Sequence, residues 1–140
     1  MANINIGRVI LGGLVAGLIV NIGEYVLNII VLGQQWMAVT SAMHLPMASG
    51  NQIILFNVLG FIEGIAAVWT YAAIRPRFGA GPKTAVIAAL LIWLTCYFLA
   101  NAFPTVMGFF PVSMLEIMLA WGIVEIILAT VAGAYFYKEA

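Results

Sequence analysis

The stretch RVILGGLVAGLIVNIGEYVLNIIVL, from Arg8 to Leu32, decides the fold. A transmembrane helix needs roughly 20 mostly apolar residues, and this segment exceeds that length. It is continuously apolar and does not alternate, which favours a helix over a strand of a membrane β-barrel. No small-x-small cleavage site follows Arg8, and the apolar run continues past Glu24. We therefore interpret the segment as a retained helix and not as a signal peptide.

Three further segments have the same character, at about residues 52–74, 84–103 and 113–136. Together with the span at about residues 8–32, they predict an all-α integral membrane protein: a four-transmembrane-helix bundle forming a single membrane domain, residues 1–140. The composition agrees, because 65% of the residues are hydrophobic and only 7% are charged, with a mean hydropathy of +1.14. The chain has no basic excess and a single cysteine, Cys96, which argues against a nucleic-acid partner and a disulfide scaffold.

The basic residues predict the orientation of the bundle. With four spans, all five lie on one side: Arg8, Arg75, Arg77, Lys83 and Lys138. The outer connections, residues 33–51 and 104–111, carry no Lys or Arg, so the positive-inside rule predicts that both termini are cytoplasmic. The basic loop 75–83 contains two prolines and two glycines, which we expect to stop the flanking helices. Short loops favour a prokaryotic inner membrane.

The two halves of the chain have the same topology, so the bundle could consist of two parallel helical hairpins. The segment Gly60-Phe61-Ile62-Glu63 resembles Gly122-Ile123-Val124-Glu125, although the third span has no carboxylate to match Glu24. The outer loop is predicted to contain a short interfacial helix from Gln34 to Met43, followed by Pro46 and Gly50.

Three glutamates lie inside the predicted spans: Glu24, Glu63 and Glu125. At 1.5 Å per residue they lie roughly 12–18 Å below the outer helix ends, at similar depths. No Lys or Arg lies within any span to pair with them. An ionised carboxylate at this depth costs at least about 2.5–3.5 kcal/mol, so they must be protonated or share a cation. We interpret them as a proton or cation site; the alternative is hydrogen bonding that only holds helices together.

Small and polar residues share helix faces with these glutamates. In the first span the stripe is Gly13, Gly17, Asn21, Glu24 and Asn28, at steps of four and three. Gly13-x-x-x-Gly17 and Gly60-x-x-x-Gly64 have the spacing of close helix pairs, so these stripes should face helices of the same bundle or of a homodimer. We expect the supporting polar lining to be Asn21, Asn28, Asn57, Asn101 and Trp121.

The fourth span begins with Ser113-x-x-Glu116, which predicts a capping box. Met43, His44 and Met47 form a candidate outer copper site, because thioether and imidazole groups suit Cu(I). Methionine is equally a flexible apolar filler. No serine–histidine–acid or cysteine–histidine arrangement can be built, so we expect no enzyme and no cofactor.

The leading hypothesis is a proton-coupled transporter or channel for a small cationic substrate, acting through the three glutamates. Its size, its four helices and a glutamate in the first helix make it comparable with the small multidrug resistance transporters, but the aromatic pattern of their third helix is missing. The second hypothesis is a non-catalytic accessory or assembly subunit of a membrane complex. The third is an outer-face copper-binding protein. The expected partners are the lipid bilayer, a proton or small cation, and either a second copy or a membrane-complex subunit.

Overall fold

The computed structural model describes residues 3–139, and every regular element in that range is a helix. The elements are α1 (Ile6–Tyr25), η1 (Val26–Val31), α2 (Gly33–Ala42), α3 (Gly50–Phe78), α4 (Pro82–Ile92), η2 (Trp93–Leu99), α5 (Ala100–Val106) and α6 (Val112–Tyr135). Both η1 and η2 are π-helical turns that continue a longer helix. Four continuous helices among the described residues are long and apolar enough to cross a membrane: α1–η1, α3, α4–η2–α5 and α6. The predicted all-α fold with four such helices is confirmed.

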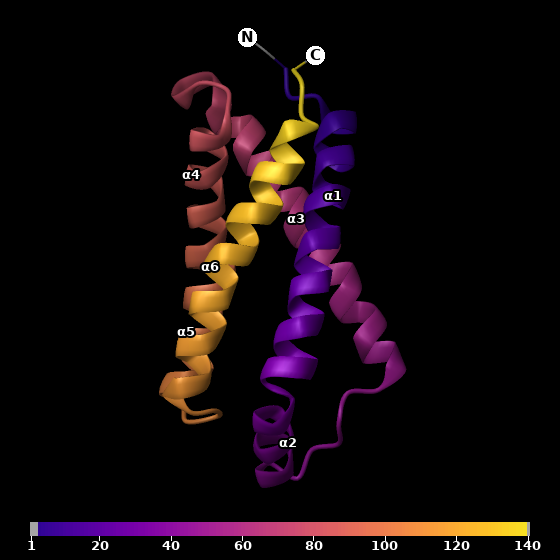
Figure 1. Cartoon of the computed structure of the whole chain (residues 1–140), viewed down its shortest axis with the longest axis vertical. Helices are drawn as coiled ribbons and strands as arrows, with labels where there is room; N and C mark the ends of the chain where they lie inside the picture. The colour runs from indigo at the N-terminus through magenta and orange to yellow at the C-terminus, as the bar shows by residue number, and fades with distance from the viewer. Residues whose placement is uncertain (1–2, 140) are drawn as a thin grey trace.

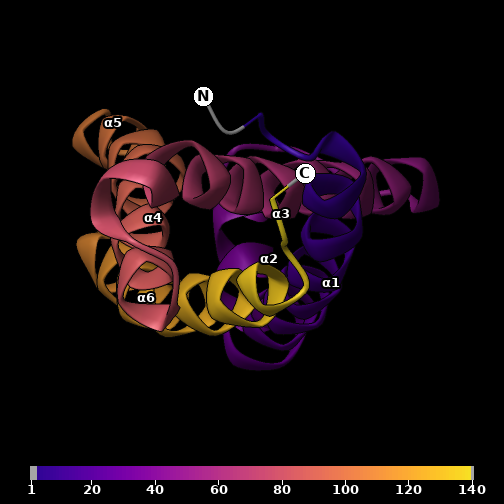
Figure 2. The same cartoon turned by 90° about the horizontal axis from the view of Figure 1, so that it is seen from above.

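The chain passes up and down the long axis of the molecule four times (Figure 1). Both ends of the described chain therefore lie at one end of the bundle, together with the turn between α3 and α4. Helix α2 and the α5–α6 hairpin lie at the opposite end (Figure 1). Helix α1 packs most extensively on α3 and then on α6, while α3 also contacts α4. Seen from above, α3 runs along one side of the bundle, from α4 to beyond α1 (Figure 2).

Glycines bring α1 and α3 into backbone contact. A Cβ atom added at Gly13 would lie 2.5 Å from the Cα of Ile65, and one at Gly17 would lie 2.7 Å from the Cα of Phe61. A Cβ atom added at Gly64 would overlap the backbone of Gly17. Both glycine motifs are therefore used within one bundle, which is one of the two arrangements that their spacing allows.

Small side chains make up much of the interior, whereas many large aliphatic and aromatic side chains point outward. Fully buried positions include Ala16, Ala67, Ala88 and Ala129, one from each of the four long helices. Among the large side chains, Phe56 remains 59% exposed. This arrangement suits a lipid environment, where burial of apolar surface gives no advantage and close contact between small residues holds helices together.

Two prolines that were expected to lie outside helices lie within them. Helix α3 continues through Pro76 to Phe78, so the predicted loop 75–83 shrinks to residues 79–81. The chain leaves α3 at Gly79, whose φ of 87° is costly for residues with a Cβ, and Pro82 then opens α4. Pro104 similarly lies within α5. A proline in the last turns of a helix removes one hydrogen bond without ending the helix.

Helix α2 (Gly33–Ala42) confirms the short helix predicted at residues 34–43, but the capping box predicted at Ser113 is wrong. Helix α6 starts one residue earlier, with Pro111 as its N-cap, and no side chain caps it. The capping box lies instead at the start of α3. There the Ser49 hydroxyl accepts from the Gln52 N–H, and the Gln52 side chain accepts from the Ser49 N–H.

Replacing Ser49 by alanine is expected to lower the free energy of unfolding by about 1 kcal/mol, because the N-cap acceptor is lost. The same replacement at Ser113 should leave stability unchanged, because its hydroxyl caps no helix. Thermal unfolding of both variants in detergent, followed by circular dichroism, checks this. Equal destabilisation of the two variants would contradict the assignment of the cap.

Candidate functional site

The three intramembrane glutamates come from three different helices and meet around one tyrosine. Glu24 lies at the end of α1, Glu63 in the middle of α3 and Glu125 in the middle of α6. Tyr97 of η2 lies among them and interacts with Glu63 and Glu125. Glu125 is 5% exposed, and the other two glutamates are partly buried. The sequence placed these carboxylates at similar depths, and the structure brings them together.

Glu125 is the most completely surrounded of the three. The Tyr97 hydroxyl donates to Oε1 at 2.8 Å, and the Trp121 indole Nε1 donates to Oε2 at 3.1 Å. Two glycines make room for this arrangement. A Cβ atom at Gly23 would overlap the Glu125 carboxyl group, and one at Gly122 would overlap the Tyr97 ring. Each carboxyl oxygen of Glu125 therefore has a side-chain donor.

Glu24 lies beside Glu125 and begins a chain of hydrogen bonds that leads to α2. Its carboxyl group lies close to that of Glu125. The Asn28 amide donates to Oε2 of Glu24 at 2.6 Å, and the Trp36 indole Nε1 donates to Oδ1 of Asn28 at 2.8 Å. Two carboxyl groups that lie this close repel each other when both are ionised, so a proton on one of them is favoured. The pair can therefore hold one proton, and Asn28 and Trp36 link it to α2.

Glu63 joins the cluster from α3. Its carboxyl group lies next to the Tyr97 hydroxyl. Its Oε1 is buried and has no hydrogen-bond partner among residues 3–139. Within that same range, no three His, Cys, Asp or Glu side chains form a group that could hold a metal ion. Glu63 therefore keeps an acceptor oxygen that no other described residue uses.

The π-helical turns place key polar groups beside the cluster. In η1 the wide turn is seen in the bond from the Leu32 N–H to the Leu27 carbonyl, five residues back. Asn28 of η1 donates to the carbonyl oxygen of Glu24, four residues back, and Asn101 donates in the same way to that of Tyr97. Each asparagine thus satisfies a carbonyl group beside a π-helical turn. Such turns occur often at functional sites.

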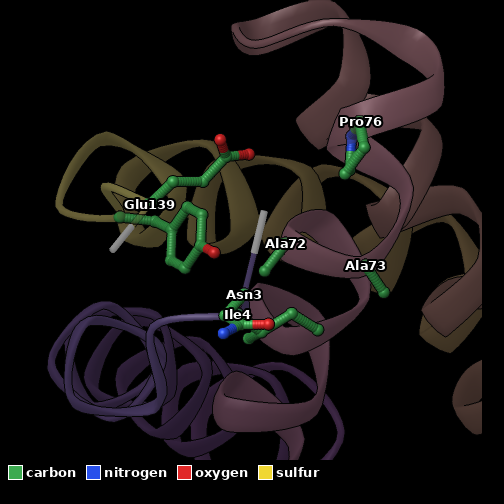
Figure 3. A pocket seen from close by; sticks show the side chains of 7 residues that line it. Asn3, Ile4, Ala72, Ala73, Pro76 and Glu139 are labelled. Atoms are coloured by element: carbon green, nitrogen blue, oxygen red, sulfur yellow. The ribbon is translucent and has the colours of Figure 1, made fainter. Parts of the chain in front are cut away.

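An open cavity of about 630 Å³ lies at the α2 end of the bundle, between η1, α2 and the loop that follows α2. Its lining includes Asn28, Trp36 and Met47. A smaller cavity of about 200 Å³ lies near the chain ends, between Asn3, Ala72, Pro76 and Glu139 (Figure 3). None of the three glutamates lines either cavity. Asn28 lines the larger cavity and donates to Glu24, so it links the two.

The other predicted site residues have separate roles. Asn21 donates to the Asn57 carbonyl oxygen and joins α1 to α3, while the Asn57 side chain bonds to its own helix. Neither Asn21 nor Asn57 lines the larger cavity at the α2 end of the bundle. Met47 does, and its sulfur accepts a hydrogen bond from the Thr40 hydroxyl, whereas Met43 and His44 do not line the cavity. The copper site stays a prediction.

Sequence reasoning missed three contributors to this site: Tyr97, Trp36 and Gly23. Tyr97 is a single hydroxyl in an apolar span, and nothing in the local pattern marks it as a partner of carboxylates. Trp36 was expected only as an interfacial residue. Gly23 carried a signal, because it is a glycine that directly precedes Glu24 inside an apolar span.

Comparison with protein families, curated proteins and solved structures finds no match to this chain. The function is therefore argued from the geometry of the carboxyl cluster and its surroundings.

Proposed function

We propose that this protein moves protons across the membrane in exchange for a small cation, using Glu24, Glu63 and Glu125. One observation carries the proposal: carboxyl groups from three helices meet around Tyr97. The Lys and Arg residues of the spans lie only in their end turns, far along the chain from these glutamates. Ionisable side chains are expensive inside a membrane and typically mark ion or proton pathways. A site with acidic groups and no basic partner can be neutral only with bound protons or with a bound cation.

The proposed roles follow from the contacts. The Glu24–Glu125 pair holds the exchangeable proton. Tyr97 and Trp121 donate to Glu125 and stabilise its negative charge when that proton leaves. Glu63 lies on the far side of Tyr97 with a free acceptor oxygen, which suits a second proton position.

We also propose that both termini face the cytoplasm of a prokaryotic cell, with the protein in its inner membrane. The five Lys and Arg residues belong to the chain ends and to the region around the α3–α4 turn. These segments lie at one end of the bundle (Figure 1). The opposite end has no Lys or Arg, which is the distribution expected for cytoplasmic termini.

Reconstitution in liposomes tests the proposed exchange. An internal pH indicator is followed while monovalent inorganic and organic cations are added outside. Exchange predicts that a transported cation raises the internal pH, because one proton leaves as each cation enters. The control is a variant in which Glu24, Glu63 and Glu125 are all replaced by glutamine. A folded wild-type protein that gives no pH change with any cation would overturn the proposal.

That negative outcome would favour the second function, an accessory or assembly subunit of a membrane complex. A specific feature supports this alternative. Residues 50–59, the outer half of α3, are exposed along all their faces except where Asn21 reaches the Asn57 carbonyl. This segment includes the polar side chains of Gln52 and Asn57. A partner helix would give these groups hydrogen-bonding partners that lipid does not offer.

A further inference from the structure

Basic side chains gather at the end of the bundle that holds both chain ends and the α3–α4 turn (Figure 1). Four of them are exposed: Arg8, Arg77, Lys83 and Lys138. The fifth, Arg75, is partly buried and forms an ion pair with Glu139, with 3.7 Å between its guanidinium nitrogen and the carboxylate oxygen. This is the only ion pair among residues 3–139, so within that range the four exposed side chains carry positive charges without an acidic partner.

Exposed apolar side chains lie next to these cations in the sequence. Phe78 directly follows Arg77 and is exposed. Phe136 comes two residues before Lys138 and is also exposed. At the headgroup level of a bilayer, aromatic side chains lie against the acyl chains while long basic side chains reach the phosphate groups. A surface that faced only water would gain nothing from exposed aromatic rings, so this mixture favours a lipid partner over a soluble acidic protein or a nucleic acid.

The buried ring of Tyr137 fixes the position of Lys138 on this surface. The Tyr137 hydroxyl accepts a hydrogen bond from the Asn5 N–H at 3.4 Å, just before α1 begins. Its ring packs edge-on against that of Tyr71 in α3, with 5.9 Å between the ring centroids. The Arg75 guanidinium lies 5.5 Å from the centroid of the same ring. The segment after α6 is therefore held against α1 and α3, and Lys138 is placed by the fold.

We propose that this end of the bundle is a docking surface for anionic phospholipids, whose phosphate groups are bound by the four exposed basic side chains. The charges are complementary, since Glu139 is the only acidic side chain of the described chain at this end and is itself paired with Arg75. Each basic residue near an anionic membrane surface strengthens attachment by about fivefold. The inference does not depend on the proposed exchange, because it concerns a surface far from the three glutamates.

Native mass spectrometry of the detergent-solubilised protein tests this surface by comparing dioleoylphosphatidylglycerol with dioleoylphosphatidylcholine. The two lipids share their acyl chains and differ in net charge. We expect the anionic lipid to bind at least about tenfold more tightly, and its affinity to fall as the concentration of ammonium acetate is raised, because salt screens exposed charges. Free glycerol phosphate should bind far more weakly than the anionic lipid, because it has no acyl chains to lie against the exposed aromatic rings.

Replacing Arg77 and Lys138 together by glutamine removes one cation beside the α3–α4 turn and one after α6. The affinity for phosphatidylglycerol is expected to fall by about 25-fold, at about fivefold for each charge. Arg77→Lys with Lys138→Arg is the matched control, because it changes the same two positions and keeps both charges. It should alter the affinity by less than about twofold, as surface substitutions usually do. Arg8→Gln with Lys83→Gln removes two other charges and keeps the test decisive if the first variant does not fold.

Equal affinity for the two lipids, or an equal loss in the glutamine and the charge-preserving variants, would overturn the lipid surface. Polyglutamate is added as an acidic polypeptide without acyl chains. If it bound through the same four residues while phosphatidylglycerol did not, the surface would fit an acidic protein partner and the lipid assignment would be wrong. None of these measurements follows proton movement, so a failure of the proposed exchange in liposomes and a failure of lipid binding are detected separately.

Discussion

Protein carrying Gly64→Leu is expected not to accumulate as a folded bundle. The reason is the contact between α1 and α3, in which a Cβ atom at Gly64 would overlap the backbone nitrogen of Gly17. Backbone atoms cannot rotate away as a side chain can, so the two helices would have to separate. Even one extra methylene group in a packed core typically costs about 1–3 kcal/mol, and leucine adds a whole side chain at a backbone contact. The recovery of monodisperse protein after detergent extraction checks this.

Gly50→Leu is the matched control, because a Cβ atom at Gly50 meets nothing within 4 Å. It should be recovered at the wild-type level with little change in melting temperature. If the glycine motifs served a homodimer instead, Gly64→Leu would give a folded monomer. A folded monomer with the wild-type melting temperature would therefore contradict the role of Gly64 inside the bundle.

Hydropathy predicts the four long helices well, because an apolar segment of this length has few other stable conformations in a membrane. It predicts their ends less well. The expected helix ends relied on Pro76 and on Ser113, and both expectations are wrong. The residue at which a helix ends depends on backbone geometry that a short sequence motif does not specify. Pro76 lies close enough to the end of α3 to be tolerated. Ser113 lies two residues after Pro111, which occupies the N-cap position of α6.

The candidate site was predictable in its acidic residues but not in its partners. Helical rise alone placed Glu24, Glu63 and Glu125 at similar depths, because depth follows from residue counts. Their convergence depends on the angles at which α1, α3 and α6 cross, and these angles follow from close contacts such as that of Gly17 with Phe61. The position of Tyr97 depends on the wide turn η2, which has no known signature in this sequence.

Among single replacements of the three glutamates, Glu125→Gln is expected to cause the largest loss of cation-driven proton movement, down to the rate of empty liposomes. Glu125 is the most deeply buried of the three and is contacted by Tyr97, Trp121 and Glu24. Glutamine preserves the size of the side chain but cannot release a proton. Glu24→Gln should give a similar loss, because the two carboxyl groups hold the proton as a pair. The double variant should be no worse than either single one, which is the expected behaviour of residues that act as a unit.

Glu63→Gln should retain measurable exchange, because Glu63 stands outside the Glu24–Glu125 pair and lies beside Tyr97. Gly23→Ala provides a test that leaves every acidic group in place. Its Cβ atom would overlap the Glu125 carboxyl group and push it away from Glu24, so exchange should fall while the protein still inserts and folds. Gly33→Ala is its control, since the nearest atom to the added Cβ is 3.8 Å away. Full activity in Gly23→Ala, or equal losses in all three glutamine variants, would mean that the Glu24–Glu125 contact is not where the proton is held.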